Sequence, residues 1–515
     1  MQCNNKRIAK NTLMLYFRQI LILLISLYTV RVVLDVLGVE DFGIYNAVGG
    51  VVSLFSFLGG TMASATQRFF SFALGQGDTE SLNKTFSVNL AIYGAIAVSA
   101  LILLETIGLW FITDQLKLPP ARFHAALIVY HYAVFTFIST ICTSPFMAII
   151  IAHEDMQIYA YVSIIEAILK LVVVFLLTWL PLDKLELYGI LFFVVSMINA
   201  VLYVGICVRK YSECQFRKFY WDKDLFCRIT GFTGWTFFGQ ISTVARNQAV
   251  TILLNQAFSP VVVASRAIAT NVSSKVNMFS TQFNVGLYPP IIKTYAANDK
   301  KEMFSLIFNG SKITFFLMWV FALPLLVEMQ TILSVWLKNL PPEAVLFTRL
   351  ALIESLILSL SLPITTAARA PGNMKIYELT LGTIQITIFV AAWTVLKMGG
   401  AAYTVYIIAI VANLIMFVLR LVIVRGLLGM ALRPFFFHVV FPVTGIILLS
   451  AVPSFVAHLI MPENLFFSFF SILLSIVFSS ISMYFIGLDQ QWRKKVRSVA
   501  LNRIEKVLTS YHPNK

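Results

Sequence analysis

The run LYGILFFVVSMINAVLYVGICV, residues 187–208, has no charged side chain over the length that a membrane helix requires. A helix crosses the hydrocarbon core with roughly 20 largely apolar residues. Thirteen other largely apolar stretches of about this length occur along the chain, separated by short polar loops. Because lipid cannot satisfy free backbone groups and these runs are too long for barrel strands, the sequence predicts an all-helical integral membrane protein with about 14 transmembrane helices.

The composition indicates the same class. Of the 515 residues, 59% are hydrophobic and 12% are charged, against about 25% charged in soluble domains. We keep the first run as a helix, because it is too long for a signal peptide. The expected spans are approximately 13–34, 42–66, 86–112, 122–152, 158–180, 187–208, 229–254, 259–290, 306–336, 344–368, 376–396, 400–424, 435–460 and 464–487.

The net charge of +15 is unevenly distributed. Joints on the side of the two termini hold 25 Lys and Arg residues, and joints on the opposite side hold 5. This asymmetry predicts that both termini are cytoplasmic. It also predicts attraction to anionic lipids, so nucleic acid is not an expected partner. The basic tail, residues 488–515, is expected either to lie at the membrane surface as an amphipathic helix or to be solvated.

Two pairs of matching segments indicate an internal repeat. Gln19-Ile20 matches Gln240-Ile241 at an offset of 221, and Pro145 with Met156 to Tyr159 matches Pro363 with Met374 to Tyr377 at an offset of 218. Each match lies six expected helices further along, so the repeats are parallel and a substrate site is expected between them. The predicted organisation is an N-lobe at 1–208, a linker at 209–228, a C-lobe at 229–424, two added helices at 425–487 and the tail at 488–515.

Basic residues inside the expected spans are the candidate functional groups, because a charge at the bilayer centre costs about 2.5–3.5 kcal/mol on insertion scales. For Arg18, Arg31, Lys312, Arg349 and Arg420, snorkelling toward a membrane surface is an alternative to function. Arg266 heads a polar stripe on the expected helix 259–290, and Arg246 lies on the preceding helix. The residues expected to line a cavity are Asn46, Ser53, Thr243, Asn247, Thr270, Ser273, Lys275, Asn277 and Thr281, although Ser and Gly stripes are also typical of plain helix packing.

Few carboxylates offset these charges. Glu166 and Lys170 are expected to pair at i,i+4, and Arg349 with Glu354 at the less favourable i,i+5, which leaves a positive surplus suited to anions. The short joints hold no clustered carboxylates, no activated nucleophile, no phosphate loop and no metal-ligand spacing. The five cysteines, Cys3, Cys142, Cys207, Cys214 and Cys227, fit neither a metal site nor a disulfide framework. We therefore expect no catalytic residues, no metal and no cofactor.

Three segments carry a resemblance to a known family. They are Arg18-Gln-Ile, the stretch Leu37-Gly-Val-Glu-Asp-Phe-Gly-Ile-Tyr45, and Ala65-Thr-Gln-Arg68-Phe-Phe followed by Leu74-Gly75. The sequence resembles, over essentially its whole length, the polysaccharide (O-antigen type) flippases of the MATE-like multidrug/oligosaccharidyl-lipid/polysaccharide exporter superfamily. The resemblance implies two six-helix lobes around a central cavity, in a transporter rather than an enzyme.

The resemblance also implies a cargo. It would be an undecaprenyl-diphosphate-linked oligosaccharide, moved from the cytoplasmic to the periplasmic leaflet of the bacterial inner membrane for surface polysaccharides such as lipopolysaccharide O-antigen. The diphosphate would be held by Arg18, Arg31, Arg246 and Arg266, and polysaccharide-assembly proteins are further expected partners. The alternatives are a lipid II flippase, an ion-coupled drug exporter of the MATE type, a membrane glycan polymerase or ligase, and a non-catalytic scaffold.

Overall fold

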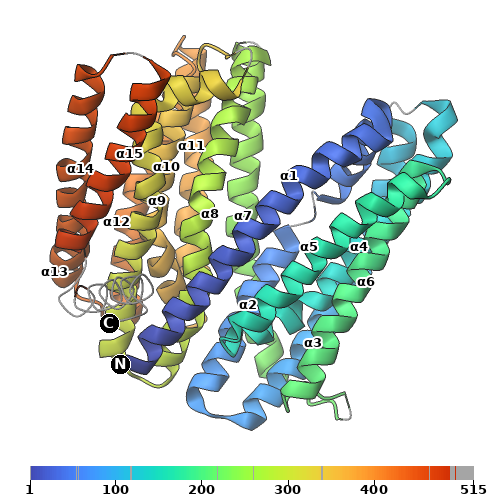
Figure 1. Cartoon of the computed structure of the whole chain (residues 1–515). Coiled ribbons are helices and arrows are strands. Elements are labelled where there is room, and N and C mark those ends of the chain that lie inside the picture. The colour runs from blue at the N-terminus through green and yellow to red at the C-terminus, as the bar shows by residue number, and fades with distance from the viewer. Residues whose placement is uncertain are drawn as a thin grey trace, which may run out of the picture. The chain divides into compact units, whose positions relative to one another are not determined.

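The computed structural model describes residues 2–53, 55, 57–115, 119–216, 218–258, 260–337, 340–462, 464–487 and 493. Every regular element within these ranges is helical, as the sequence predicts, and Figure 1 shows the long helices and their short connections. The principal helices are α1 (Gln2–Ser53), α2 (Phe57–Gln76), α3 (Thr79–Leu103), α4 (Phe123–Ala152), α5 (Met156–Trp179), α6 (Lys184–Lys210), α7 (Lys223–Ala257), α8 (Pro260–Ala296), α9 (Lys300–Trp336), α10 (Ala344–Arg369), α11 (Lys375–Lys397), α12 (Thr404–Leu428), α13 (Leu432–Phe435), α14 (Phe441–Ile460) and α15 (Leu465–Ser482).

Ten helical segments among the described residues are long and apolar enough to cross a membrane. They begin at Thr79 and end at Gly487, and they cover the expected spans from 86–112 onward, apart from 229–254 and 259–290. These two exceptions correspond to α7 and α8, which are long but more polar, since they carry the arginines and amides noted above. The total of 14 spans therefore stays a prediction, while the all-helical membrane class is confirmed.

The first two expected spans have different bounds in the structure. α1 contains a break at Gly38, where φ is 76° and ψ is 170°, a conformation that glycine adopts readily. The expected span 42–66 was wrong as a single helix, because α1 ends at Ser53 and α2 begins at Phe57. α2 then continues ten residues beyond the expected end, to Gln76, where Gly77 with φ 69° ends it and Asp78 caps α3. Hydrophobicity alone does not mark these helix ends.

The chain forms two compact units, which we describe separately. Unit 1 consists of residues 1–244, 285–303 and 366–383, and unit 2 of 245–284, 304–365 and 384–515. Unit 1 contains the whole expected N-lobe together with parts of the expected C-lobe, because the first part of α7 and the ends of α8, α10 and α11 belong to it, whereas unit 2 lies entirely within residues 245–515. The lobe and linker boundaries stay a prediction. The tail at 488–515 lies outside the described residues, except Arg493.

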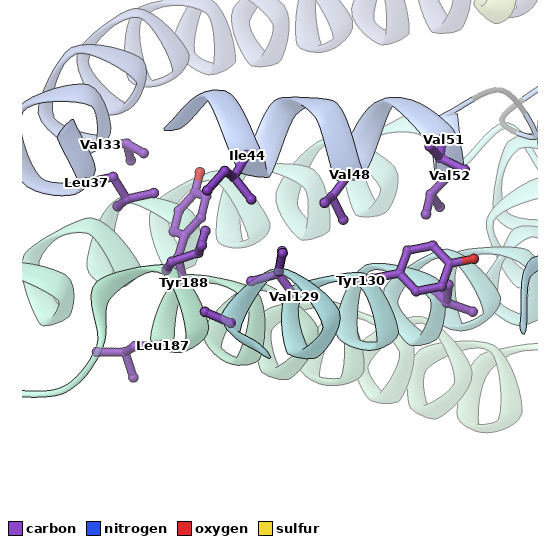
Figure 2. Close-up of a cluster of buried hydrophobic side chains, with 14 of the residues drawn as sticks. Val33, Leu37, Ile44, Val48, Val51, Val52, Val129, Tyr130, Leu187 and Tyr188 are labelled. Atoms are coloured by element: carbon purple, nitrogen blue, oxygen red, sulfur yellow. The ribbon is translucent and has the colours of Figure 1, made fainter. Parts of the chain in front are cut away.

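An apolar core and an ion-pair cluster hold the first helices of unit 1 together. Figure 2 shows Ile44 and Val48 of α1 directed toward α4, where Val129 and Tyr130 lie. Near the break in α1, the Arg122 guanidinium donates from Nε to Asp41 at 2.8 Å and from Nη2 to Asp183 at 3.2 Å. These bonds join three helix ends and hold the pKa of the Asp183 carboxyl below its usual value. Asp41 thus has a structural role.

In unit 2, α14 packs against α9. Phe315, Trp319 and Leu323 of α9 share one apolar core with Val443 and Ile446 of α14. The indole Nε1 of Trp319 donates to Ser450 Oγ at 2.9 Å, which satisfies both buried polar groups. The first of the two added helices is therefore an integral part of this unit rather than an appendage.

Candidate functional site

Arg246 lies in a polar cluster formed by three helices of unit 2. Its Nη1 lies 3.5 Å from Oε1 of Glu354 on α10, and Nδ2 of Asn413 on α12 donates to the same oxygen at 3.1 Å. The side chains of Arg246 and Glu354 are 12% and 15% exposed, so this ion pair is largely removed from solvent. Arg246 Nε is buried and has no hydrogen-bond partner among the described residues. One face of the guanidinium thus keeps an unused donor.

Arg266 extends the cluster to α8. Its Nε donates to Thr251 Oγ1 on α7 at 3.1 Å, and its guanidinium carbon lies 5.6 Å from the centre of the Tyr406 ring on α12. Tyr406 and Asn413 are seven residues apart, so they lie on one face of α12 about two turns from each other. This face of α12 therefore contacts Arg266 through Tyr406, and it contacts Glu354, the ion-pair partner of Arg246, through Asn413. We call Arg246, Arg266, Glu354, Asn413 and Tyr406 the arginine cluster.

The arginine cluster is positively charged, because two guanidiniums accompany one carboxylate. A partly buried positive surplus favours an anion, and guanidinium groups bind phosphate through paired, charge-assisted hydrogen bonds. The predicted pair of Arg349 with Glu354 was wrong. Arg349 donates instead to the carbonyl of Val327 at 3.2 Å, because at i,i+5 the two side chains point about 140° apart around the helix.

The polar stripe of α8 is divided between exposed and buried positions. Thr270, Thr281 and Lys275 are exposed, whereas Ser273 is buried and Asn277 is half-buried. The hydroxyls of Thr270 and Thr281 donate to carbonyls one turn back in their own helix, which is the usual arrangement for threonine in a membrane helix. Asn277 Oδ1 is buried without a partner among the described residues. Their role as cavity lining stays a prediction.

The remaining predicted lining residues lie on α1 and α7. Asn46 is exposed and donates to the Phe42 carbonyl at 2.7 Å, and Thr243 donates to the Gly239 carbonyl at 3.0 Å. Asn247 accepts from Arg246 Nη2 at 3.0 Å and so adjoins the arginine cluster. The side chains of Arg31 and Ser53 lie outside what the structure describes.

Arg18, the remaining predicted diphosphate ligand, is buried in unit 1 at 4% exposure. Its guanidinium carbon lies 4.4 Å from the centre of the Tyr159 ring, and Nη1 donates to Ser163 Oγ at 3.4 Å. Both partners also line a polar cavity of about 240 Å³ inside unit 1. This burial excludes the snorkelling alternative for Arg18.

The same cavity contains the ion pair predicted from spacing. Lys170 Nζ donates to Glu166 Oε1 at 2.6 Å, and Asn199 Nδ2 donates to Glu166 Oε2 at 3.1 Å. The predicted pair is confirmed. Its carboxylate is thereby neutralised within unit 1.

A second cluster, which sequence reasoning missed, joins the ends of α2, α8 and α10 within unit 1. Arg68 is 5% exposed, and it donates to the Ala370 carbonyl from Nε at 3.1 Å and from Nη2 at 2.6 Å. Arg369 donates to Ser64 Oγ at 3.4 Å, and Tyr288 donates to the Ser64 carbonyl at 3.1 Å. We call these five residues the helix-end junction.

Two features show how closely the helices approach at the helix-end junction. A Cβ on Gly75 would lie 2.7 Å from the Lys293 carbonyl oxygen, so α2 and α8 meet where only glycine fits. Nearby, Lys293 Nζ lies 2.7 Å from Glu154 Oε1, and Asn11 near the N-terminus donates to the Glu154 carbonyl at 3.1 Å. The junction therefore lies on the side of the N-terminus. In the sequence Arg68 and Gly75 carry only the family resemblance, because their contacts are more than 200 residues away along the chain.

Among the residues that the structure describes, no group of three or more His, Cys, Asp or Glu side chains could hold a metal ion. The arginine cluster has no nucleophile beside a base. Its chemistry is that of binding an anion.

Comparison with known proteins identifies a family and a fold. A family model described as "Polysaccharide biosynthesis protein" matches residues 8–295. No curated protein matches the sequence. Solved structures match at low identity. A crystal structure of a MATE mutant has a TM-score of 0.73 at 12% identity, covering 83% of this chain and 97% of that one.

Two further structures agree. An outward-facing multidrug resistance MATE family transporter of the MOP superfamily has a TM-score of 0.71 at 12% identity, and a MOP superfamily transporter from Pyrococcus furiosus has 0.70 at 12%. Each covers 83% of this chain and 96% of the other. These values show that the fold is the MATE transporter fold, which confirms the MATE-like fold class that the sequence resemblance implied, while the two lobes and the central cavity stay a prediction.

Proposed function

We propose that this chain, which belongs to the polysaccharide biosynthesis protein family, is a flippase for a polyprenyl-diphosphate-linked oligosaccharide. It moves the cargo from the cytoplasmic to the periplasmic leaflet of a bacterial inner membrane, for synthesis of a surface polysaccharide such as O-antigen. The chain is a transporter rather than an enzyme, as its family and the solved transporters of its fold indicate. Both termini are cytoplasmic in this proposal.

The observation that carries the proposal is the arginine cluster. Placing two guanidiniums in membrane helices costs several kcal/mol, roughly 2.5–3.5 for each on insertion scales. One carboxylate, Glu354, offsets only part of that charge, and Arg246 Nε has no partner among the described residues. A diphosphate supplies acceptor oxygens and negative charge for both arginines, while the polyprenyl chain stays in lipid.

The helix-end junction supplies the element that changes during transport. In the proposed cycle, its bonds hold the cytoplasmic side closed, and breaking them opens a path from the cytoplasm. Alternating access then requires that the cargo bind more weakly in the state open to the periplasm. Arg68 and Arg369 are the groups whose bonds must break, because they donate to α10 and to α2 respectively.

The charge of the cargo distinguishes the proposed flippase from a drug exporter. The Pyrococcus furiosus transporter is described as having a binding pocket of reverse polarity, which suggests a different function for that protein. By analogy, a surplus of positive charge in the present chain favours an anionic cargo over a cationic drug. A lipid II flippase shares this charge requirement and differs in the glycan, so glycan selectivity is what distinguishes the two.

Binding measurements test the proposed cargo class. The purified chain should bind a short-chain polyprenyl diphosphate at least ~10-fold more tightly than the uncharged polyprenol, since one charge-assisted hydrogen bond is worth about 1.5–3 kcal/mol. Arg246→Gln and Arg266→Gln should each remove most of this preference, whereas Arg433→Gln, an exposed control in unit 2, should not. Equal affinity for the two lipids, or tighter binding of a cationic dye, would exclude the proposal.

A further inference from the structure

A cavity in unit 2 has a chemistry unlike that of the arginine cluster. It has a volume of about 630 Å³ and lies among α9, α10, α12 and α14. Its wall consists of aromatic and aliphatic side chains, with Arg349 and Thr444 as the polar members. The volume falls within the ~300–1,000 Å³ typical of ligand sites. Such a wall suits a hydrocarbon chain.

The cavity is long and opens on the surface of the helices. Along α10 its lining extends from Arg349 to Leu360, which is about 16 Å at 1.5 Å per residue. That length is about half of the ~30 Å hydrocarbon core, the depth of one leaflet. Three lining residues from different helices, Ile353, Leu414 and Phe455, are 38%, 49% and 41% exposed. A lipid chain can therefore enter from the side.

Arg349 supplies a charge at one end of the cavity. It lies five residues after α10 begins at Ala344, about 8 Å from the helix end, which is the headgroup side of the hydrocarbon core. Its Nη2 donates to the Val327 carbonyl, but Nε is buried without a partner. No carboxylate among the described residues pairs with this guanidinium. An anion at the membrane surface is the complementary group.

We propose that this cavity binds one acyl chain of an anionic phospholipid whose phosphate pairs with Arg349. The guanidinium selects the charged headgroup, and the apolar wall holds the chain over the depth of one leaflet. The site is separate from the arginine cluster and does not depend on the proposed cargo. The lipid covers α9 and α14 where they pack together, and so stabilises unit 2.

Trp319 provides a reporter, because it lines the cavity and its indole is fixed by the bond to Ser450. The assay measures quenching of tryptophan fluorescence in nanodiscs whose phosphatidylglycerol or phosphatidylcholine carries brominated chains. The fluorescence of Trp319 is obtained as the difference between the native chain and Trp319→Phe. Phosphatidylglycerol should quench this signal at about tenfold lower mole fraction, the ratio that about 1.4 kcal/mol produces. Ala451→Phe should reduce quenching by both lipids, since it fills the cavity.

Substitutions of Arg349 test whether it selects the lipid headgroup. Arg349→Gln should abolish the preference for phosphatidylglycerol, Arg349→Lys should keep part of it, and Arg433→Gln should leave it unchanged. Equal quenching by the two lipids in the native chain would overturn the proposal. So would displacement of the brominated lipid by an equal mole fraction of polyprenyl phosphate, because the cavity would then belong to the cargo chain.

Discussion

Replacing Arg68 by glutamine tests whether the helix-end junction holds one side of the transporter closed. The guanidinium makes two hydrogen bonds to the Ala370 carbonyl, at 3.1 and 2.6 Å, and stacks on Phe69 and Phe72 at 4.6 Å from each ring centre. Hydrogen bonds from a charged group contribute about 1.5–3 kcal/mol. Because both bonds share one acceptor, we count them once and expect a loss of about 2 kcal/mol, or ~30-fold in the closed-to-open equilibrium.

The assay measures accessibility of the junction. Ser64→Cys, in a chain whose natural cysteines are replaced by serine, is labelled with a membrane-impermeant maleimide from the side of the termini. Ser64 is half-buried, its hydroxyl accepts from Arg369 and its main-chain carbonyl accepts from Tyr288, so we expect a thiol at this position to be protected while the junction is closed. Arg68→Gln should raise the labelling rate about 30-fold if opening precedes labelling. Lys84→Gln is the control, because it removes only an i,i+4 pair with Glu80.

One result would refute this reasoning. If Arg68→Gln keeps the native melting temperature and labels at the native rate, its bonds do not hold the junction closed. An increase in labelling together with a large loss of stability would indicate unfolding rather than opening, and the melting curve separates the two.

Three further predictions concern stability. Gly75→Ala should lower the free energy of unfolding by about 1–3 kcal/mol, because its Cβ would meet the α8 backbone. Gly94→Ala is the control, since a Cβ at Gly94 has open space and the change should be neutral or stabilising. Equal melting temperatures of the two variants would contradict this prediction. Arg122→Gln should flatten the dependence of the melting temperature on acid pH. Asp183, whose pKa is lowered by Arg122, stabilises the native chain above about pH 3.8, and this contribution is lost as the pH falls through the pKa of Asp183 in the folded chain. Identical acid profiles of the native chain and Arg122→Gln would exclude this role of Arg122. Glu354→Gln should cost about 3 kcal/mol by leaving its arginine unpaired, and added diphosphate lipid should restore part of that loss.

The helical class and one ion pair could be predicted because their signals are local. Unbroken apolar runs exceed the length of a span, and Glu166 with Lys170 falls at the spacing at which helix neighbours meet. The pairing of Arg349 with Glu354 failed for the same physical reason, since i,i+5 lies off that face. The actual partner of Glu354 is Arg246, 108 residues away, and no local pattern reports it.

The bounds of α2 show a second limit of sequence reasoning. Most side chains from Arg68 to Ala73 are buried within unit 1, beyond the expected end of the span, so hydrophobicity does not mark where the helix ends. The Gly77-Asp78 pair is a local signal that could have placed the end, because glycine stops a helix and aspartate caps the next one.

The most direct test of the account is translocation of a labelled polyprenyl-diphosphate oligosaccharide between the leaflets of proteoliposomes. The native chain should move this lipid and leave a cationic dye in place, and Arg246→Gln should slow movement by at least ~10-fold while Arg433→Gln does not. Movement of the dye without the lipid would contradict the account and indicate a drug exporter. Lipid movement at the native rate in Arg246→Gln would show that the arginine cluster does not hold the diphosphate.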